Sequence, residues 1–194
     1  MMMLLFKIKR KITSVFINLG KKFFLLEMKS LYPKRFFVSY GIKFSKLFSI
    51  DFDTSGSIIE IGRGVQFRNF CQIKSGTNGK LKIGNNVFFN NSCSINCLHQ
   101  ITIGDDCQFG ENVKFYDHNH MYSSSSQLIS SQGYTVGAIK IGSNCWFGSD
   151  VTILKNVEVG DNVIIGANCV IYKSIPAGSI VINQQQLLIK PIQK

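Results

Sequence analysis

The sequence of 194 residues has no long hydrophobic run and no sign of a cleavable leader. Lysines and arginines interrupt every apolar stretch before it reaches the roughly 20 residues that a membrane-spanning helix needs, so we expect no transmembrane helix. Lys21 and Lys22 follow the first apolar stretch, and no small-residue cleavage site is evident, which disfavours a secretory signal peptide. We therefore expect a cytoplasmic protein.

The sequence also has few acidic residues, and they are unevenly distributed. Residues 1–50 contain 11 of the 22 Lys and Arg residues but only Glu27 among the 11 acidic ones, and so carry +10 of the formal net charge of +11. We treat residues 1–50 as a basic helical and capping segment, separate from a domain spanning residues 51–194. Residues 36–53 are expected to cap the end of that domain.

The basic segment has a helical pattern of apolar residues. Spacings of three and four predict a basic amphipathic helix near the N-terminus, with Leu5, Ile8, Ile12, Val15 and Leu19 on one side. This layout favours an anionic membrane surface over nucleic acid or an acidic glycan, although packing against the rest of the protein explains it equally well. A second helical stretch is expected over residues 23–31, before Pro33.

From residue 141 onward an apolar residue returns every six positions. The register is Ile141, Phe147, Ile153, Val159, Ile165 and Ile171. A smaller residue precedes most of these by two places, and glycine often follows directly. A period of six fits neither a helix nor an alternating strand, so it indicates a repeat in which three hexapeptides make one triangular coil of short parallel strands.

The same pattern occurs earlier in the chain, with interruptions. The first block is Ile61, Phe67 and Ile73. The second block is Ile83, Phe89 and Ile95, followed after two extra residues by Ile103, Phe109 and Phe115. Fifteen large positions at three per coil predict about five coils. The fold class is thus an all-β solenoid with an N-terminal basic helical segment and a protruding loop.

The six cysteines do not form a CxxC pair, which disfavours a metal or redox motif. Five of them occupy the small inward position of the repeat, where cysteine serves as a small hydrophobe: Cys71, Cys93, Cys107, Cys145 and Cys169. We expect buried, structural thiols.

A long insertion, residues 116–138, interrupts the repeat. A solenoid places extra residues on its surface, where they often form binding loops. The insertion is rich in serine and contains His118 and His120, two of only three histidines in the chain. We interpret it as an active-site loop.

The block IKIGSNCWFGSDVTILKNVEVGDNVIIGANCVIYKSIPAGSIV, together with VKFYDHNHMY upstream, resembles the hexapeptide-repeat acyltransferases. The resemblance covers roughly residues 55–190, and it is to the branch that contains galactoside and maltose acetyltransferases and sugar or capsule O-acetyltransferases. It implies a left-handed parallel β-helix and a homotrimer with active sites between subunits. It also implies acetyl-CoA as donor, a histidine general base and no metal.

The resemblance assigns roles to particular residues. The family's catalytic histidine matches His120, five positions after Phe115, whereas His118, beside Asp117, is the alternative base or a substrate-binding residue. An unperturbed imidazole suits proton abstraction near neutral pH. The other implied roles are an oxyanion and pantetheine contact at the Ser149 amide, acceptor or reaction-centre contacts at Asn90 and Trp146, and coenzyme A contacts at Ala167 and Lys173. Asn90 could instead satisfy its own backbone at a corner, Trp146 could pack at a trimer interface, and His99 is expected to have no chemical role.

Two departures weaken the match. Asn96, Cys97 and Leu98 stand where sugar acetyltransferases of this branch carry an acceptor-binding aspartate, and Asn183 and Gln185 replace a glycine and proline turn. The leading hypothesis is an acetyl-CoA-dependent O-acetyltransferase acting on a sugar, such as a cell-surface polysaccharide unit or lipid-linked precursor. The alternatives are acetylation of an amino sugar, small glycoside or antibiotic, a zinc hydratase of the γ-carbonic anhydrase kind, and a non-catalytic scaffold.

Overall fold

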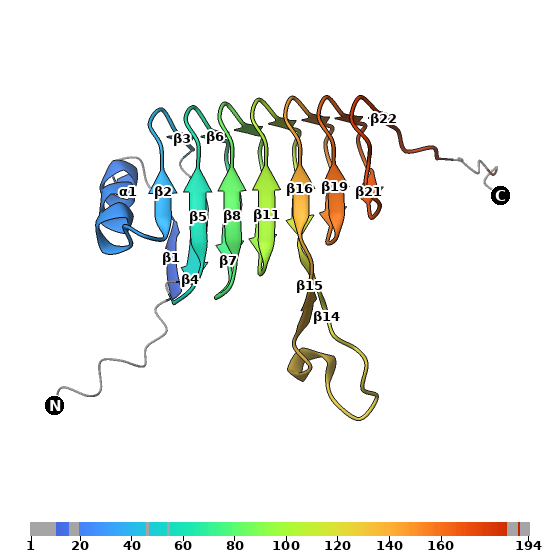
Figure 1. The fold of residues 1–194 in the computed structure, drawn as a ribbon, viewed down its shortest axis with the longest axis horizontal. Helices are drawn as coiled ribbons and strands as arrows, with labels where there is room; N and C mark the ends of the chain where they lie inside the picture. The colour runs from blue at the N-terminus through green and yellow to red at the C-terminus, as the bar shows by residue number, and fades with distance from the viewer. Residues whose placement is uncertain (1–10, 16–19, 46, 54, 186–189, 191–194) are drawn as a thin grey trace.

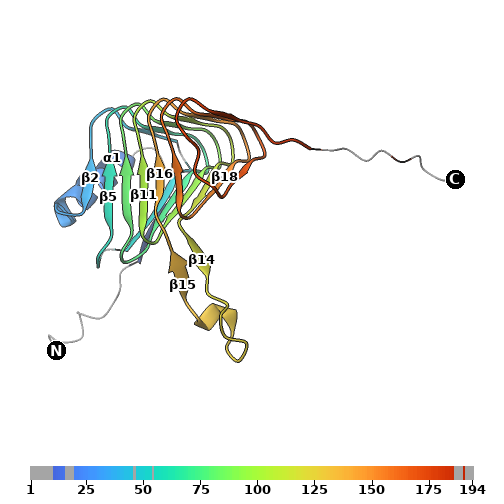
Figure 2. The ribbon, with the colours of Figure 1, turned by 45° about the vertical axis from the view of Figure 1, so that its right-hand side comes forward.

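The computed structural model describes residues 11–15, 20–45, 47–53, 55–185 and 190. Three parallel sheets form the sides of a prism with six complete turns (Figures 1 and 2). Sheet A contains β4 (Ser49–Asp53), β7 (Gln72–Ser75), β10 (Ser94–Cys97), β13 (Lys114–Tyr116), β18 (Thr152–Leu154) and β21 (Val170–Ile171). Sheet B contains β2 (Phe36–Val38), β5 (Ile58–Ile61), β8 (Lys80–Ile83), β11 (Gln100–Ile103), β16 (Ile139–Ile141) and β19 (Val157–Val159).

Sheet C completes the prism and continues with one strand, β22, beyond the sixth turn, while sheet A has an added antiparallel strand at its first turn, described below. It contains β3 (Lys43–Phe44), β6 (Gln66–Phe67), β9 (Phe88–Phe89), β12 (Gln108–Phe109), β17 (Trp146–Phe147), β20 (Ile164–Ile165) and β22 (Ile180–Val181). The chain runs from sheet B to C to A in each turn. We call the three edges corner BC, corner CA and corner AB. The fold is an all-β parallel solenoid, as expected for a left-handed β-helix.

The six-residue repeat fills the interior. The large residue of each hexapeptide stacks on its equivalent in the next turn, because in-register parallel strands place identical positions above one another. On sheet C this makes a column of phenylalanines, in which the Phe67, Phe89, Phe109 and Phe147 ring centroids lie 4.7–4.8 Å apart. All six cysteines are buried free thiols, which confirms their role as core residues.

The corners use left-handed backbone conformations. Asparagine and aspartate tolerate positive φ better than other residues with a side chain, since they hydrogen-bond locally. Most positive-φ residues of the later turns are of this kind, and they are Asp106, Asn112, Asn144, Asp150, Asn156, Asn162 and Asn168. Glycine takes the equivalent place at Gly41 and Gly64 in the first turns.

The solenoid begins earlier than the sequence pattern predicted. Strands β2, β3 and β4 form a full first turn, so residues 36–53 belong to the β-helix, the coil number is six rather than five, and the boundary placed at residue 50 falls inside β4. Val38, Phe44 and Ile50 pair with Ile61, Phe67 and Ile73 of the next turn. The six-residue repeat is therefore present here, but Ile42 and Phe48 occupy places that later turns give to smaller residues.

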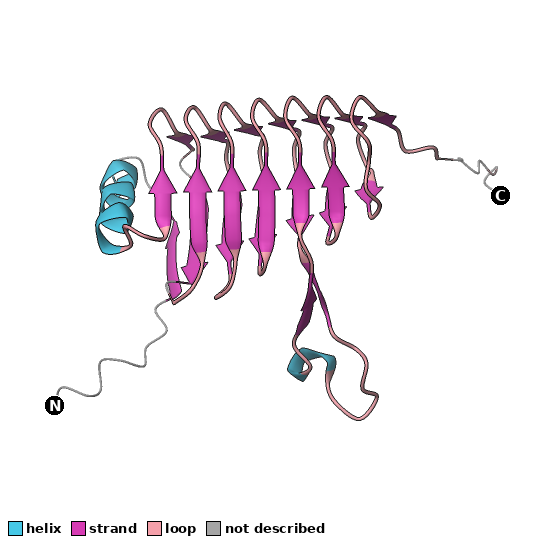
Figure 3. Cartoon of the chain, viewed as in Figure 1, coloured by secondary structure: helices cyan, strands magenta, loops and turns pink. Residues whose placement is uncertain are grey.

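The N-terminal segment agrees with one helical prediction and not with the other. Helix α1 (Gly20–Leu31) confirms the second predicted helix, and it lies beside β2 at the end of the solenoid (Figures 1 and 3). The predicted helix over residues 5–19 is wrong where it can be compared, because β1 (Lys11–Val15) is a strand paired antiparallel to β4. The rest of that prediction, residues 5–10 and 16–19, lies outside the described residues. No helix in the described part of the chain is long and apolar enough to cross a membrane.

Candidate active site

The insertion at corner AB is an ordered arm that projects from the solenoid between β13 and β16 (Figures 1 and 2). It contains β14 (His118–His120), the 3₁₀ turn η1 (Ile129–Ser131) and β15 (Tyr134–Val136). The two strands pair antiparallel, with His118 opposite Val136 and His120 opposite Tyr134. Alternate residues of a strand face the same side, so both histidines project from one face of the arm.

Tyr134 brings the two histidines together. Its ring centroid lies 5.2 Å from that of His118 and 4.6 Å from that of His120. The sequence pattern did not identify Tyr134 as a site residue, because it lies far from the histidines along the chain. The short alternation YTV, facing HNH across a hairpin, is the signal that could have found it.

Asp117 anchors the base of the arm and is completely buried. Its carboxylate accepts hydrogen bonds from the backbone N–H groups of Leu98, at 2.9 Å, and His99, at 2.7 Å. One carboxylate oxygen also lies 3.1 Å from Nδ1 of His118. Three polar partners therefore compensate the burial of this charge, as a buried carboxylate requires.

The structure pairs Asp117 with His118 and not with His120. The His118 side chain is 15% exposed, whereas His120 is exposed to solvent. A carboxylate on Nδ1 fixes the tautomer and orientation of an imidazole and leaves Nε2 as the basic nitrogen. His99 contributes its backbone amide to Asp117, while its side chain is exposed.

Cys97 lies beside this pair and is fully buried. Burial, reinforced by the negative charge of Asp117, raises the pKa of the Cys97 thiol. Since the thiolate is the reactive form of cysteine, Cys97 is an inert neighbour and not a nucleophile.

Backbone amides at the corners of successive turns are bonded to side chains of the following turn. At corner BC the amides of Arg63, Asn85, Asp105 and Ser143 bond to Asn85, Asp105, Ser143 and Asp161 in turn. Hydrogen bonds from the backbone and side chain of Asn85 hold the pKa of the Asp105 carboxyl below its usual range. These bonds tie the turns together at this edge.

The row at corner CA ends at Ser149, as the row at corner BC ends at Asp161, because the next turn carries an alanine at both places, Ala167 and Ala177. The Glu111 amide donates to Ser149 Oγ at 3.2 Å, but the residue after Ser149 in the row is Ala167. A methyl group accepts no hydrogen bond, so the side chain of the next turn leaves the Ser149 amide open. Gly148 also allows a close approach here, because a Cβ on it would lie 2.6 Å from the Ala167 nitrogen.

The other predicted residues are spread over the surface. Trp146 lies on the outer face of sheet C with 53% exposure, opposite Gln108 and Ile164. Asn90 follows β9 and accepts a hydrogen bond from the Asn91 amide at 2.9 Å, which is the local backbone role considered for it. The Lys173 ammonium lies 5.6 Å from the centre of the Tyr172 ring.

Within one chain the predicted site residues fall into two groups. Asp117, His118 and His120 lie at corner AB, whereas Asn90, Ser149 and Ala167 lie at corner CA. Sheet A separates these two corners. The chain therefore presents two half-sites at opposite edges of one side of the prism.

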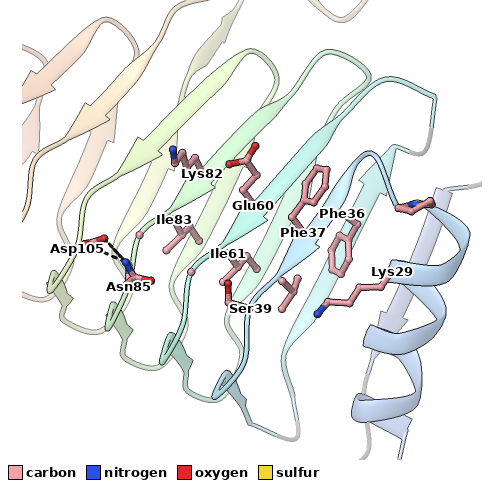
Figure 4. Close-up of a pocket in the computed structure, with 14 residues that line it drawn as sticks. Lys29, Phe36, Phe37, Ser39, Glu60, Ile61, Lys82, Ile83, Asn85 and Asp105 are labelled. Atoms are coloured by element: carbon pink, nitrogen blue, oxygen red, sulfur yellow. Dashed lines mark hydrogen bonds between the residues drawn. The ribbon is translucent and has the colours of Figure 1, made fainter.

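One cavity of the solenoid contains none of these residues. It has a volume of about 670 Å³ and lies between α1 and the outer face of β2, β5 and β8, with Lys29, Phe37, Glu60 and Lys82 on its walls (Figure 4). Among the described residues no group of three or more His, Cys, Asp or Glu side chains could hold a metal ion.

Comparisons with known proteins agree with the repeat and with the fold. Residues 138–173 match the family model described as bacterial transferase hexapeptide (six repeats). A probable acetyltransferase of Mycobacterium tuberculosis is 26% identical over 132 residues, which are 68% of this chain and 44% of that protein. The chain thus spans less than half the length of this relative.

Solved structures share the architecture at low sequence identity. AntD, an N-acyltransferase from Bacillus cereus, in complex with dTDP and 3-hydroxybutyryl-CoA, superposes with a TM-score of 0.56 and 18% identity, covering 77% of this chain and 76% of that one. A hexapeptide-repeat-containing acetyltransferase from Vibrio cholerae gives a TM-score of 0.52 and 18% identity, covering 87% and 81%. These likenesses establish a shared fold.

Proposed function

We propose that the chain is an acetyl-CoA-dependent acyltransferase that acetylates a hydroxyl of a sugar. The observation that carries the proposal is the Asp117–His118 pair at the base of the arm, where a buried carboxylate holds the imidazole at 3.1 Å. The repeat match, the acetyltransferase relative and the acyl-CoA enzymes that share the fold support the reaction class. A cell-surface polysaccharide unit or a lipid-linked precursor is the proposed acceptor.

In this proposal His118, and not the predicted His120, is the general base. Nε2 of His118 removes the proton from the sugar hydroxyl as its oxygen attacks the thioester carbonyl. Asp117 stabilises the imidazolium and keeps Nδ1–H engaged. The tetrahedral intermediate then collapses to the acetyl ester, and the departing thiolate of coenzyme A takes the proton back from His118.

The open amide of Ser149 supplies a donor for the oxyanion in the proposal. A well-placed donor of this kind contributes roughly 3 to 4 kcal/mol to transition-state stabilisation. Ala167, through its backbone, and Lys173, near the phosphates, are the proposed coenzyme A contacts. Trp146 borders the reaction centre, and Asn90 is retained as an acceptor contact although its carbonyl oxygen already bonds to Asn91.

The separation of the half-sites supports a homotrimer. Because sheet A lies between corners AB and CA, the His118 of one chain reaches a Ser149 amide only if that amide belongs to a neighbouring copy. We therefore propose that active sites form where corner AB of one subunit meets corner CA of the next.

One alternative acceptor has a specific observation in its favour. AntD is described as an N-acyltransferase, in complexes with dTDP and with a dTDP-linked amino sugar, and it shares this fold. An amino sugar attached to a nucleotide is therefore the second candidate. Its amine would attack the same thioester carbonyl and give an amide in place of an ester.

The test is transfer of radiolabelled acetyl from acetyl-CoA to panels of neutral sugars and amino sugars, with His118→Ala and His120→Ala as a matched pair. We expect about a 100- to 10,000-fold loss of turnover in His118→Ala and a much smaller loss in His120→Ala. The reverse order would restore His120 as the base. Full activity in both variants would contradict histidine catalysis, and absence of coenzyme A binding would contradict the proposed donor.

A further inference from the structure

The cavity beside α1 lies on the part of the solenoid that the proposed trimer leaves free. Its walls are α1, the outer face of β2, β5 and β8, and corner BC (Figure 4). Corner BC is the edge opposite sheet A, whereas the proposed contacts between subunits use corners AB and CA. The cavity is therefore accessible in the proposed trimer as well as in a single chain.

One column of outward side chains crosses the six turns of sheet B and passes through this cavity. From β2 to β19 its members are Phe37, Glu60, Lys82, Thr102, Lys140 and Glu158. Phe37 is the one apolar residue in the column, and it is 45% exposed. An aromatic ring in this position adds little to the core and offers a flat surface to a ligand.

The charged side chains at the two ends of this column differ in their partners. Lys140 and Glu158 are joined, with 3.7 Å between Nζ and Oε2. Glu60 and Lys82 are also neighbours in adjacent turns, but neither side chain forms an ion pair or hydrogen bond with another described residue. Lys29 adds a second ammonium from the α1 wall (Figure 4). The polar groups of the cavity thus keep their hydrogen-bonding capacity for a ligand.

This set of groups selects a neutral ligand that is rich in hydroxyls. A hydroxyl can donate to the Glu60 carboxylate or accept from the Lys82 ammonium, so both groups find partners on such a ligand. A polyanion would be repelled by Glu60, and a cation by Lys29 and Lys82. The Phe37 ring suits the apolar face of a pyranose, whose C–H groups stack on an aromatic surface. The volume of about 670 Å³ lies within the roughly 300–1,000 Å³ typical of small-ligand sites.

We propose that this cavity binds neutral sugar units of the acceptor, away from the hydroxyl that is acetylated, so that the acceptor is a chain of several sugars. The link to acetylation rests on the proposed function, whereas the binding itself does not.

The outer face of sheet B connects the cavity to the base of the arm. Strand β16, which follows the arm, lies two strands beyond β8, or about 10 Å along the solenoid. The strand between them, β11, turns Gln100 and Thr102 outward, because Ile101 and Ile103 are buried. A sugar chain held in the cavity can therefore continue over a polar surface toward the histidines.

The test is binding of the fluorescently labelled full chain, without acetyl-CoA, to a microarray of neutral, amino and acidic oligosaccharides of increasing length. We expect binding to neutral chains that strengthens with length. Phe37→Thr should weaken it about tenfold by removing one aromatic anchor, and threonine already stands in this column at Thr102. Glu60→Gln should weaken it about fivefold through the loss of one charge-assisted hydrogen bond. The matched control is Glu158→Gln, which changes a carboxylate of the same column that is already paired and should bind as the parent protein does.

Kinetics separate this inference from the proposed reaction. Phe37→Thr should raise KM for an oligosaccharide acceptor about tenfold and leave kcat unchanged, because the lost contact is the same in the ground and transition states. His118→Ala should lose turnover but keep parental glycan binding. No binding to neutral glycans, or an equal loss in Glu158→Gln, would overturn the site whatever the transfer assays show. Binding of UMP that depends on Phe37 would assign the cavity to a nucleotide instead, and a parental KM in Phe37→Thr would overturn the link to the acceptor.

Discussion

The two turns formed by residues 139–171 differ from the two formed by residues 36–75, although both have the same three-sided shape. In the later turns an apolar residue returns every six positions, and all positive-φ residues are asparagine or aspartate. In the earlier turns Phe48 takes an inward place that later turns give to smaller residues, and Phe70 takes a left-handed corner. A residue that suits the backbone conformation and packing of its place in the turn says little about function. A residue that does not suit its place is more informative.

The largest effect should come from removing one ring of the phenylalanine column. Phe109 is buried, with Phe89 and Phe147 on either side at 4.8 Å. Phe109→Ala should cost about 3 to 5 kcal/mol of unfolding free energy, because the surrounding turns cannot close the cavity. Urea denaturation followed by circular dichroism measures it.

Phe48→Ala is the matched change in the first turn. Phe48 is equally buried, but it lies in the first turn, at the end of the solenoid. We expect a smaller loss, about 2 to 3 kcal/mol, because an end turn can relax or open locally. If Phe48→Ala were the more destabilising variant, the first turn would be as integral to the core as the regular turns.

The arm also interrupts the regular repeat, and a substitution of Asp117 tests its role. In Asp117→Asn the new amide nitrogen cannot accept hydrogen bonds from Leu98 and His99, and His118 loses its carboxylate. We expect turnover to fall about 100- to 1,000-fold, with little change in KM for acetyl-CoA. Steady-state kinetics with the best acceptor measures both.

Asp106→Asn is the control for that change, because Asp106 is an exposed corner residue whose left-handed φ of 58° suits asparagine. It should retain parental kinetics and stability. An Asp117→Asn enzyme with parental turnover would show that the carboxylate shapes the corner without acting through His118.

The spacing between regular turns can be tested at two glycines in equivalent positions. A Cβ on Gly148 would lie 2.6 Å from the Ala167 nitrogen, whereas a Cβ on Gly166 would find its nearest neighbour at 3.4 Å. Gly148→Ala should therefore destabilise by about 1 to 3 kcal/mol, while Gly166→Ala should be nearly neutral. Thermal denaturation of the pair measures the difference, and equal melting temperatures would mean that the turns can separate at this corner without cost.

The sequence predicted the regular part of the fold because its information is local and repeated. The repeat from Ile141 to Ile171 identified the inward residues, and these are buried. The same repeat at Val38, Phe44 and Ile50 was not recognised, since the companions Ile42 and Phe48 are too large for the expected pattern. Strand β1 was predicted as helix because its apolar spacing fits a helix, and only pairing with β4 reveals it as a strand.

The candidate site was harder to predict for a physical reason. The alternation HNH puts both histidines on one face, so sequence spacing cannot choose between them. The choice depends on Asp117, whose partners are backbone amides of the preceding turn, 18 and 19 positions away. Tyr134 reaches the histidines only through the pairing of β14 and β15. None of these contacts is part of the six-residue repeat, so the repeat could not predict them.

The smallest predicted effect is a gain in stability, whereas the other core and glycine variants are expected to lose stability. Phe70→Asn replaces an exposed ring at φ 62° with a residue that tolerates this conformation, as Asn112 and Asn168 do at the same corner. We expect the unfolding free energy to rise by about 0.5 to 1 kcal/mol, a gain of about 1 to 4 °C in melting temperature for a chain of this size. Phe70→Ala is the control, because it removes the same ring without supplying a side chain suited to positive φ, and it should gain less. A variant that is more stable than the parent protein would mean that the first turns give up stability at this corner and that the ring does not serve the fold. If Phe70→Asn proved less stable than the parent protein, the ring would serve the fold, and the difference between the early and the regular turns would be a matter of packing alone.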